Sequence, residues 1–130
     1  MTEPDPVLEQ LTGPGGPFEI AVEDVLGVPT QVYATRMKTM RELMAQSAAR
    51  AGVDFVVQGD DRMTFGDNDR RARAAAASLA RLGVGVGDRV ALLSANNPDW
   101  IVTFWACAAL GAVVVPLNAW WKAEDLEFGL

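Results

Sequence analysis

Residues 87–118 read GDRVALLSANNPDWIVTFWACAALGAVVVPLN, and they predict a strand, a buried helix and a second strand. Residues 90–93 are continuously apolar, which is typical of a strand covered on both faces in a parallel sheet. Asn97 offers a side-chain acceptor for a helix N-terminus, and Pro98 suits the first helical position. The helix would continue over residues 101–110, which are apolar nearly all round and should therefore be buried.

A second strand is predicted at residues 112–117, where β-branched valines dominate. Gly111 can adopt the positive φ of a helix C-terminus, and Pro116 marks where strand pairing should stop. Two strands joined by a helix should be parallel, with a right-handed crossover. The predicted fold class is therefore α/β, with a βαβ parallel unit at residues 89–117 and a preceding hairpin and helices.

The hairpin and the first of these helices lie between residues 39 and 65. Residues 39–42 form a capping-box pattern that opens a helix, and Gly52 ends it. The predicted inner face of this helix comprises Met40, Leu43, Met44, Ser47, Ala48 and Ala51. Residues 55–57 and 63–65 flank a polar turn and predict a hairpin. The aspartates of that turn favour local hydrogen bonding over metal binding, because no further carboxylates stand at coordinating intervals.

A second helix is predicted from the capping pattern at residues 64–67 to Leu82. Its inward positions would be Asn68, Ala72, Ala75, Leu79 and Leu82, and its outward positions Arg70, Arg71, Arg73 and Arg81. Residues 83–88 contain three glycines and resemble the start of a dinucleotide-binding loop. They follow a helix and open a strand, the reverse of what such a loop requires, so they predict a helix end and a turn.

Residues 1–35 differ in composition from the rest of the chain. They contain six acidic residues and no Lys or Arg, which gives this segment a net charge of −6. From Arg36 onward, 11 basic and 11 acidic residues balance. The prolines and glycines of residues 1–17 predict a mobile or extended tail. Residues 18–22 alternate weakly, as in a short edge strand, and residues 27–29 should break it. We therefore expect an acidic, Pro/Gly-rich N-terminal extension at residues 1–35.

Composition excludes several classes of function. The balanced charge after residue 35 leaves no basic stripe, so nucleic-acid binding is not expected. The chain has no histidine, which excludes Ser-His and Cys-His catalysis and histidine metal sites within these residues. Cys107 is the only cysteine, which is compatible with a reducing cytoplasm, and its apolar surroundings predict a core residue rather than a reactive thiol.

Residues 100–117 raise the question of a membrane span. They are 18 residues with Thr103 as the only polar side chain, which reaches the lower edge of spanning length. Gly111 and Pro116 interrupt the run and no basic residues flank it, so a buried βαβ unit is favoured. The acidic, proline-broken start of the chain does not resemble a signal peptide. We expect a cytoplasmic protein and leave peripheral membrane contact open.

Three segments together resemble one family: Gly-Asp-Arg-Val-Ala at 87–91, Asn-Pro-Asp-Trp at 97–100, and Gly-Ala-Val-Val-Val-Pro-Leu-Asn at 111–118. They are similar to the N-terminal region of the AMP-forming acyl-CoA synthetases, within the adenylate-forming ligase and luciferase superfamily. The resemblance runs from about residue 40 to residue 130 and implies that residues 36–130 begin the large N-terminal domain of such a ligase. That family usually has leucine at the position of Asn68, so this buried amide would need hydrogen-bond partners.

The resemblance implies an ATP-dependent acyl-CoA ligase, acting on a long- or medium-chain fatty acid or another carboxylic acid. Such an enzyme forms an acyl-adenylate and pyrophosphate, and the coenzyme A thiol then displaces AMP. The parent enzyme would require ATP, Mg²⁺ and coenzyme A. The family's phosphate loop, its acidic residues and its late lysine have no counterpart here, and the sequence stops inside a helical pattern. We therefore expect a truncated fragment that is inactive alone, binds none of these cofactors and has no catalytic, cofactor-binding or metal residue.

Two other interpretations remain open. One is a free-standing α/β binding or interaction module without ligase activity. The other is a membrane-attached protein anchored by its tryptophans, which are Trp100, Trp105, Trp120 and Trp121. Residues 118–121 follow the second strand, where ligands usually meet an α/β sheet, and are the best candidate for a cleft lining or an acyl-chain or membrane contact. Uncovered sheet edges and apolar helix faces should also make the fragment self-associate.

Overall fold

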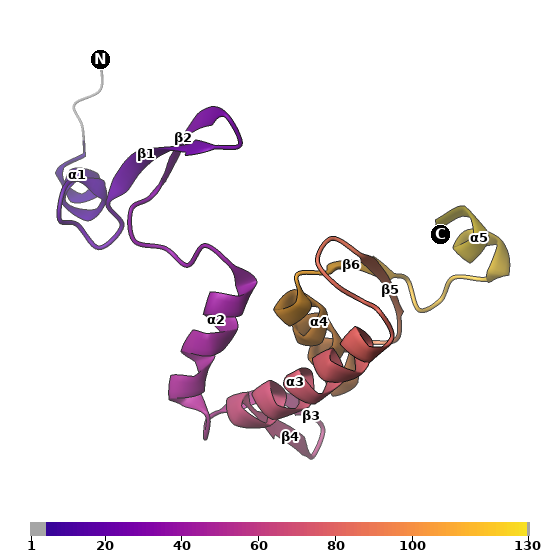
Figure 1. The fold of residues 1–130 in the computed structure, drawn as a ribbon. Coiled ribbons are helices and arrows are strands. Elements are labelled where there is room, and N and C mark those ends of the chain that lie inside the picture. Colours follow the sequence, from indigo (N-terminus) through magenta and orange to yellow (C-terminus); the bar gives the residue numbers. More distant parts are fainter. Residues whose placement is uncertain (1–4, 130) are drawn as a thin grey trace. The chain divides into compact units, whose positions relative to one another are not determined.

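The computed structural model describes residues 5–129, and the chain divides into two compact units, residues 1–38 and 39–130 (Figure 1). The first unit contains a short helix and a hairpin. Helix α1 is Pro6–Thr12, strand β1 is Ile20–Val25, and strand β2 is Val28–Tyr33, paired antiparallel with β1. The second unit contains the other helices and strands.

The N-terminal unit is more regular than the sequence predicted. The expected tail is wrong from residue 5 onward, because Asp5 Oδ1 accepts a hydrogen bond from Val7 N at 2.9 Å and caps α1. Residues 1–4 of that expectation lie outside the described residues. The break expected at residues 27–29 occurs at the turn that contains Gly27, but Val28 and Pro29 already belong to β2. Leu26 and Gly27 have φ of 54° and 84°, so they form a tight type I′ turn from which β2 departs.

The helices and hairpin expected between residues 39 and 81 are confirmed. Helix α2 is Met40–Ser47, extended by the 3₁₀ turn η1 at Ala48–Arg50. Strands β3, Asp54–Gln58, and β4, Asp61–Thr64, form an antiparallel hairpin, and α3 is Phe65–Arg81. Of the predicted inner face of α2, only Met44 is buried. Within the described residues, most of that apolar face is therefore uncovered.

The βαβ unit forms as predicted. Strand β5 is Arg89–Leu93, helix α4 is Pro98–Leu110, and strand β6 is Val113–Leu117. The strands are parallel, and Arg89 pairs with Val113 through to Leu93 with Leu117, one residue beyond Pro116. The expectation that both sheet faces are covered is wrong for the described residues, because Leu93 and Val113 are exposed. One face of this two-stranded sheet is open.

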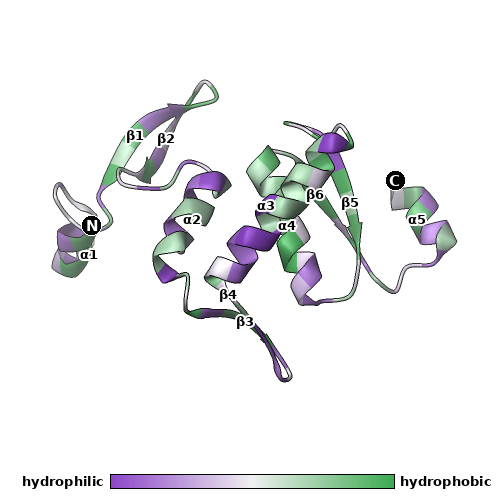
Figure 2. Ribbon diagram, turned by 60° about the horizontal axis from the view of Figure 1, so that its bottom comes forward, coloured by the Kyte–Doolittle hydropathy of each residue, from purple (hydrophilic) through white to green (hydrophobic). Residues whose placement is uncertain are grey.

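The core of the second unit lies where α3 packs against α4. Ala72 of α3 and Ala106 and Cys107 of α4 are fully buried, and their small side chains let the two helices approach closely. Figure 2 shows α4 coloured hydrophobic over most of its length, as expected of a buried helix. The buried residues of α3 are Asn68, Ala72 and Ala76. Leu82, predicted to face inward, is exposed because it follows the last turn of α3 and precedes Gly83 at φ 93°.

Two capping arrangements fix the ends of α3. Thr64 and Asp67 form the predicted capping box: Asp67 N donates to Thr64 Oγ1 at 3.1 Å, and Thr64 N donates to Asp67 Oδ2 at 3.1 Å. The Thr64 hydroxyl also donates to Asp67 Oδ2, at 2.6 Å. At the other end, Val84 N donates to Leu79 O at 3.1 Å, which closes the helix beyond Gly83.

The capping box gives the chain a pH-dependent share of its stability. The hydrogen bond from the Thr64 hydroxyl, together with the nearby Arg70, holds the pKa of Asp67 below its usual value. A carboxyl group whose pKa is lower in the folded than in the unfolded state stabilises the fold at pH values above its unfolded-state pKa. This contribution is lost as the pH falls through the folded-state pKa. Between about pH 7 and about pH 3, urea midpoints should fall more for the parent chain than for Asp67→Asn. An equal fall in both chains would contradict this assignment.

Gly111 is required at the end of α4. Its φ is 75°, and a Cβ built there would lie 3.2 Å from Val86 Cγ2. Gly111→Ala should lower the free energy of unfolding by about 1 kcal/mol, because a side chain disfavours this backbone conformation. Urea titration followed by circular dichroism measures the change. Gly52→Ala is the control, since nothing lies within 4 Å of its Cβ position, and it should cause no loss.

Candidate functional site

The carboxyl ends of β5 and β6 bring two loops to one edge of the sheet. Leu93 and Leu117 are the last paired residues, so residues 94–97 and 118–122 leave the sheet at the same edge. Ligands of open α/β sheets usually bind beyond the carboxyl ends of strands. This edge is therefore the position at which the sequence analysis expected a cleft lining.

The loop after β5 is held by its own side chains. Asn97 Nδ2 donates to Ser94 Oγ at 3.1 Å, and Asn97 Oδ1 accepts from Trp100 N at 2.8 Å, which confirms the predicted N-cap of α4. Asp99 stands in the first turn of α4, where a carboxylate favours the helix dipole. Arg71 Nη2 donates to Asp99 Oδ1 at 2.5 Å. The Trp100 amide and the Asp99 carboxylate at this helix start are thus engaged within the chain.

The loop after β6 separates its two tryptophans. Asn118 Oδ1 accepts from Trp120 N at 3.0 Å, and Asn118 O accepts from Trp121 N at 3.0 Å. This turn leaves Trp120 87% exposed, whereas Trp121 lies against helix α5, Ala123–Gly129. A Cβ at Gly129 would stand only 2.7 Å from Trp121 Cζ3. Of the two predicted candidates, Trp120 is the more open ring, since Trp121 is 36% exposed.

A hollow of ≈ 360 Å³ lies beside the carboxyl edge, between β3 and the start of α4. It is lined by Val56, Val57, Gln58, Asn96, Asn97, Pro98, Trp100 and Ile101. Gln58 Nε2 donates to Asn96 O at 3.2 Å and joins the two walls. None of the lining side chains titrates, so this hollow can present apolar surface and amide groups but cannot transfer protons.

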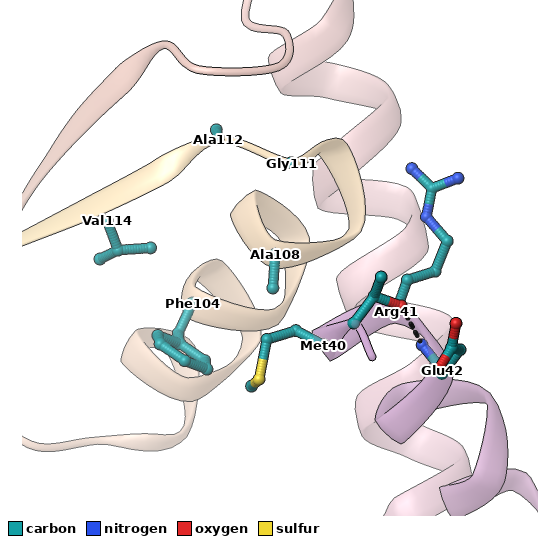
Figure 3. A pocket seen from close by; sticks show the side chains of 9 residues that line it. Met40, Arg41, Glu42, Phe104, Ala108, Gly111, Ala112 and Val114 are labelled. Atoms are coloured by element: carbon teal, nitrogen blue, oxygen red, sulfur yellow. Dashed lines mark hydrogen bonds between the residues drawn. The ribbon is translucent and has the colours of Figure 1, made fainter. Parts of the chain in front are cut away.

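A larger hollow of ≈ 680 Å³ lies between the start of α2, the second half of α4 and the start of β6 (Figure 3). Met40, Phe104, Ala108 and Val114 give it apolar walls. Arg41, although charged, serves the fold: its Nη2 donates to Ala109 O at 2.6 Å, in the last turn of α4. A cation at this position complements the helix dipole. Neither hollow could be predicted from the sequence, because the walls of each come from segments about forty or more residues apart.

The glycine-rich residues 83–88 form a turn, as predicted. Gly85 N donates to Asp88 Oδ2 at 2.8 Å, so a carboxylate already occupies an amide that a phosphate loop would leave open. Asp88 N donates back to Gly85 O at 3.3 Å. This arrangement connects α3 to β5 and does not fit a phosphate.

Metal and thiol chemistry would require clustered ligands or an accessible cysteine. Within residues 5–129, no three His, Cys, Asp or Glu side chains gather closely enough to hold a metal ion. Cys107 is a core residue, as predicted: it is fully buried, and desolvation raises its pKa. Over the same residues, no helix combines the length and apolarity needed to cross a bilayer.

The profile of the family described as AMP-binding enzyme matches residues 43–130, which is more than half of the chain. The chain belongs to this family. Among the curated relatives of this AMP-binding chain is a long-chain-fatty-acid–CoA ligase of Escherichia coli O157:H7, 34% identical over 105 residues that cover 79% of the chain and 19% of the relative. A feruloyl-CoA synthase of an Amycolatopsis species is 39% identical over 75 residues, covering 58% of the chain and 15% of the relative.

Solved structures agree with this assignment. The N-terminal domain of FACL13 from Mycobacterium tuberculosis superposes with a TM-score of 0.67 and 34% identity, covering 72% of this chain and 25% of that one. The fold expected from the resemblance, part of the N-terminal subdomain of an adenylate-forming ligase, is therefore confirmed. The chain spans less than a fifth of the two curated relatives' lengths.

Proposed function

We propose that the whole protein is an ATP-dependent acyl-CoA ligase and that residues 36–130 begin its large N-terminal domain. The observation that carries this proposal is the match of residues 43–130 to the AMP-binding enzyme family. The relatives named above are ligases that make coenzyme A thioesters, which supports a carboxylic acid substrate, ATP and coenzyme A. Residues 1–35 would be an extension of this domain.

The part played by the described residues would be structural. Asn97 already engages the Trp100 amide at the start of α4, and Arg71 engages the Asp99 carboxylate there. In the turn before β5, Asp88 engages the Gly85 amide. The smaller hollow has no titratable side chain. In the larger hollow the Thr39 hydroxyl serves as the N-cap of α2, where it accepts a hydrogen bond from Glu42 N at 3.1 Å. We therefore expect acyl-adenylate formation, and the Mg²⁺ that neutralises the leaving pyrophosphate, to depend on residues outside this chain, and residues 1–130 alone to be inactive.

For the substrate we propose a long- or medium-chain fatty acid, because the Escherichia coli relative is a long-chain-fatty-acid–CoA ligase. The feruloyl-CoA synthase makes an aromatic acid the alternative. We expect the protein to act in the cytoplasm. Peripheral membrane contact would be made by the open ring of Trp120, whose aromatic face suits a bilayer interface.

The first experiment is to read the native gene past the codon for Leu130, and to purify the product of the full reading frame. With ATP, Mg²⁺ and coenzyme A, this product should form AMP and an acyl-CoA, faster from dodecanoate than from ferulate. The 130-residue chain should show no ATP-pyrophosphate exchange in a parallel assay. A frame that stops at Leu130 would favour the free-standing module, and exchange by the short chain would contradict the structural role.

A further inference from the structure

The alternation of hydrogen-bonded and non-bonded pairs in the N-terminal hairpin determines which backbone N–H and C=O groups point outward, away from the partner strand. Ala34 N donates to Glu19 O at 2.7 Å, and bonded and non-bonded pairs alternate along an antiparallel ladder. The bonded pairs are therefore Ala21 with Val32, Glu23 with Thr30, and Val25 with Val28. The backbone N–H and C=O groups of Ile20, Val22 and Asp24 consequently point away from β2, along the outer edge of β1.

The two outer edges of this hairpin are not equivalent. Pro29 pairs with Asp24 at a non-bonded position, so the outer edge of β2 lacks a donor there. Proline is a common means of protecting an edge strand from pairing. Strand β1 has no proline, and its edge offers an uninterrupted row of donors and acceptors.

Nothing within residues 5–38 covers this strand. None of residues 5–38 is buried, and Val22 is 67% exposed. The rings of Phe18 and Tyr33 lie 6.1 Å apart on the same face as Ile20, and all three side chains are exposed. A two-stranded hairpin alone is marginally stable in water, and further strands with an apolar face stabilise it.

We propose that β1 pairs antiparallel with β1 of a second copy of the chain, across a two-fold axis at Val22. The product is a four-stranded sheet in the order β2, β1, β1 of the second copy, β2 of the second copy. The pairing joins Val22 to Val22 and Ile20 to Asp24 through the outward groups. It is independent of the ligase activity proposed above.

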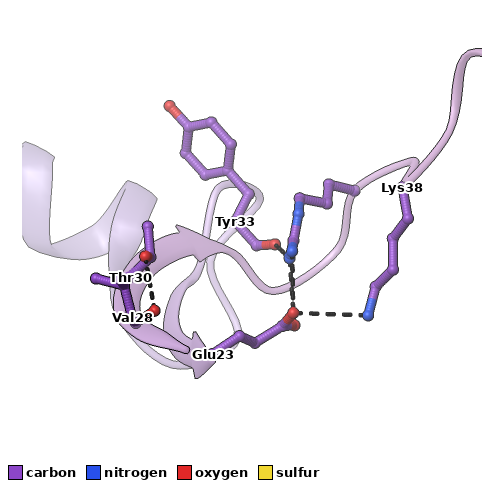
Figure 4. Close-up of polar contacts among 6 residues, drawn as sticks. Glu23, Val28, Thr30, Tyr33 and Lys38 are labelled. Atoms are coloured by element: carbon purple, nitrogen blue, oxygen red, sulfur yellow. Dashed lines mark hydrogen bonds and ion pairs between the residues drawn. The ribbon is translucent and has the colours of Figure 1, made fainter. Parts of the chain in front are cut away.

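Charge selects this register among the neighbouring ones. With the axis at Val22, Glu23 faces Ala21 and Glu19 faces Val25. An axis at Ala21 would place Glu19 opposite Glu23, and an axis at Glu23 would place two copies of Glu23 opposite each other. Like charges directly opposite each other destabilise strand pairing. Glu23 is in addition engaged inside its own hairpin, by Arg36 Nη2 at 2.9 Å and Lys38 Nζ at 3.6 Å (Figure 4).

Two proline variants test the edge. Val22→Pro removes an outward donor of β1, and its matched control Gln31→Pro removes the outward donor of the paired residue on β2. Both leave the internal hydrogen bonds of the hairpin in place. Sedimentation equilibrium of the 130-residue chain should show a dimer whose dissociation constant rises about thirtyfold in Val22→Pro, through two lost hydrogen bonds, and stays unchanged in Gln31→Pro.

A disulfide tests the register without the risk that a proline unfolds the hairpin. Only residue 22 faces its own copy, and Cys107 is buried, so Val22→Cys should form an intermolecular disulfide on mild oxidation. Ala21→Cys and Glu23→Cys should cross-link less. A monomeric parent chain, a dimer insensitive to Val22→Pro, or preferential cross-linking at residue 21 or 23 would each overturn the proposal.

Discussion

Ala72→Leu is expected to lower the free energy of unfolding by about 3 kcal/mol, because it forces a larger side chain into the closest contact of the second unit. Ala72 is 0% exposed on α3, and the residues buried on the facing helix α4 include Ala106 and Cys107, which are also fully buried. Side chains of this size leave no free volume for three further carbon atoms. The two helices would have to separate, which would also displace the sheet joined to α4. Urea titration followed by circular dichroism measures the loss.

Ala77→Leu is the matched control for this substitution. Ala77 lies on the same helix five residues further on and is exposed. Leucine and alanine are both good helix formers, so this change should alter the free energy of unfolding by less than about 0.5 kcal/mol. Equal effects at both positions would show that α3 does not pack on α4 through Ala72.

The close α3–α4 contact has a functional consequence. Helix α4 connects the two parallel strands, so its distance from α3 helps to set where the carboxyl edge of the sheet lies. The loops that follow β5 and β6 leave the sheet at that edge, and Asn97 and Asn118 each hold their own segment through a local hydrogen bond. In the proposed ligase, a displaced α4 would therefore move Trp120 as well as destabilise the fold.

The features that were best predicted from the sequence are those that depend on neighbouring residues. Thr39, Thr64 and Asn97 each cap a helix through a hydrogen bond that spans three residues, and all three caps were readable from the sequence. The parallel βαβ unit was also predictable, because an apolar helix between two β-branched segments has few alternative arrangements. In the βαβ unit, the local sequence pattern and the packing of the helix on the strands favour the same structure.

The predictions were wrong where a distant segment or an unusual backbone conformation determines the local structure. The hairpin of β1 and β2 turns at Leu26, a residue that rarely takes a positive φ, so no Asn-Gly or Asp-Gly signal marked the turn. Ala76 is buried although it was not among the predicted inward positions. Leu82, which was predicted to face inward, is exposed because α3 ends one residue before it. The helical period alone does not locate that end.

The candidate site could be predicted only in part. Its position, beyond the carboxyl ends of the strands, follows from the topology of parallel sheets. The difference in exposure between Trp120 and Trp121 could not be predicted, because it depends on where α5 places Gly129. The two hollows depend in the same way on segments that the sequence keeps far apart, such as Met40 and Phe104.

Asn68→Leu is expected to raise the free energy of unfolding by about 2 kcal/mol, because it removes a buried polar atom that has no partner. Asn68 is 4% exposed in the first turn of α3, and its Oδ1 makes no hydrogen bond among the described residues. Leucine has the same branching and nearly the same size, and it is the residue that the resemblance to acyl-CoA synthetases places there. Thermal and urea unfolding of the two chains measure the gain.

Asn68→Ala separates the removal of the amide from the filling of the space. Both substitutions eliminate the unpaired oxygen, but alanine leaves a cavity, so this variant should be less stable than Asn68→Leu by at least about 2 kcal/mol. If Asn68→Leu were instead less stable than the parent chain, Oδ1 must accept a hydrogen bond from a buried water or from a residue outside the described part. In that case the amide would position the start of α3 and, through Arg71 and Asp99, the start of α4 beside the carboxyl edge of the sheet.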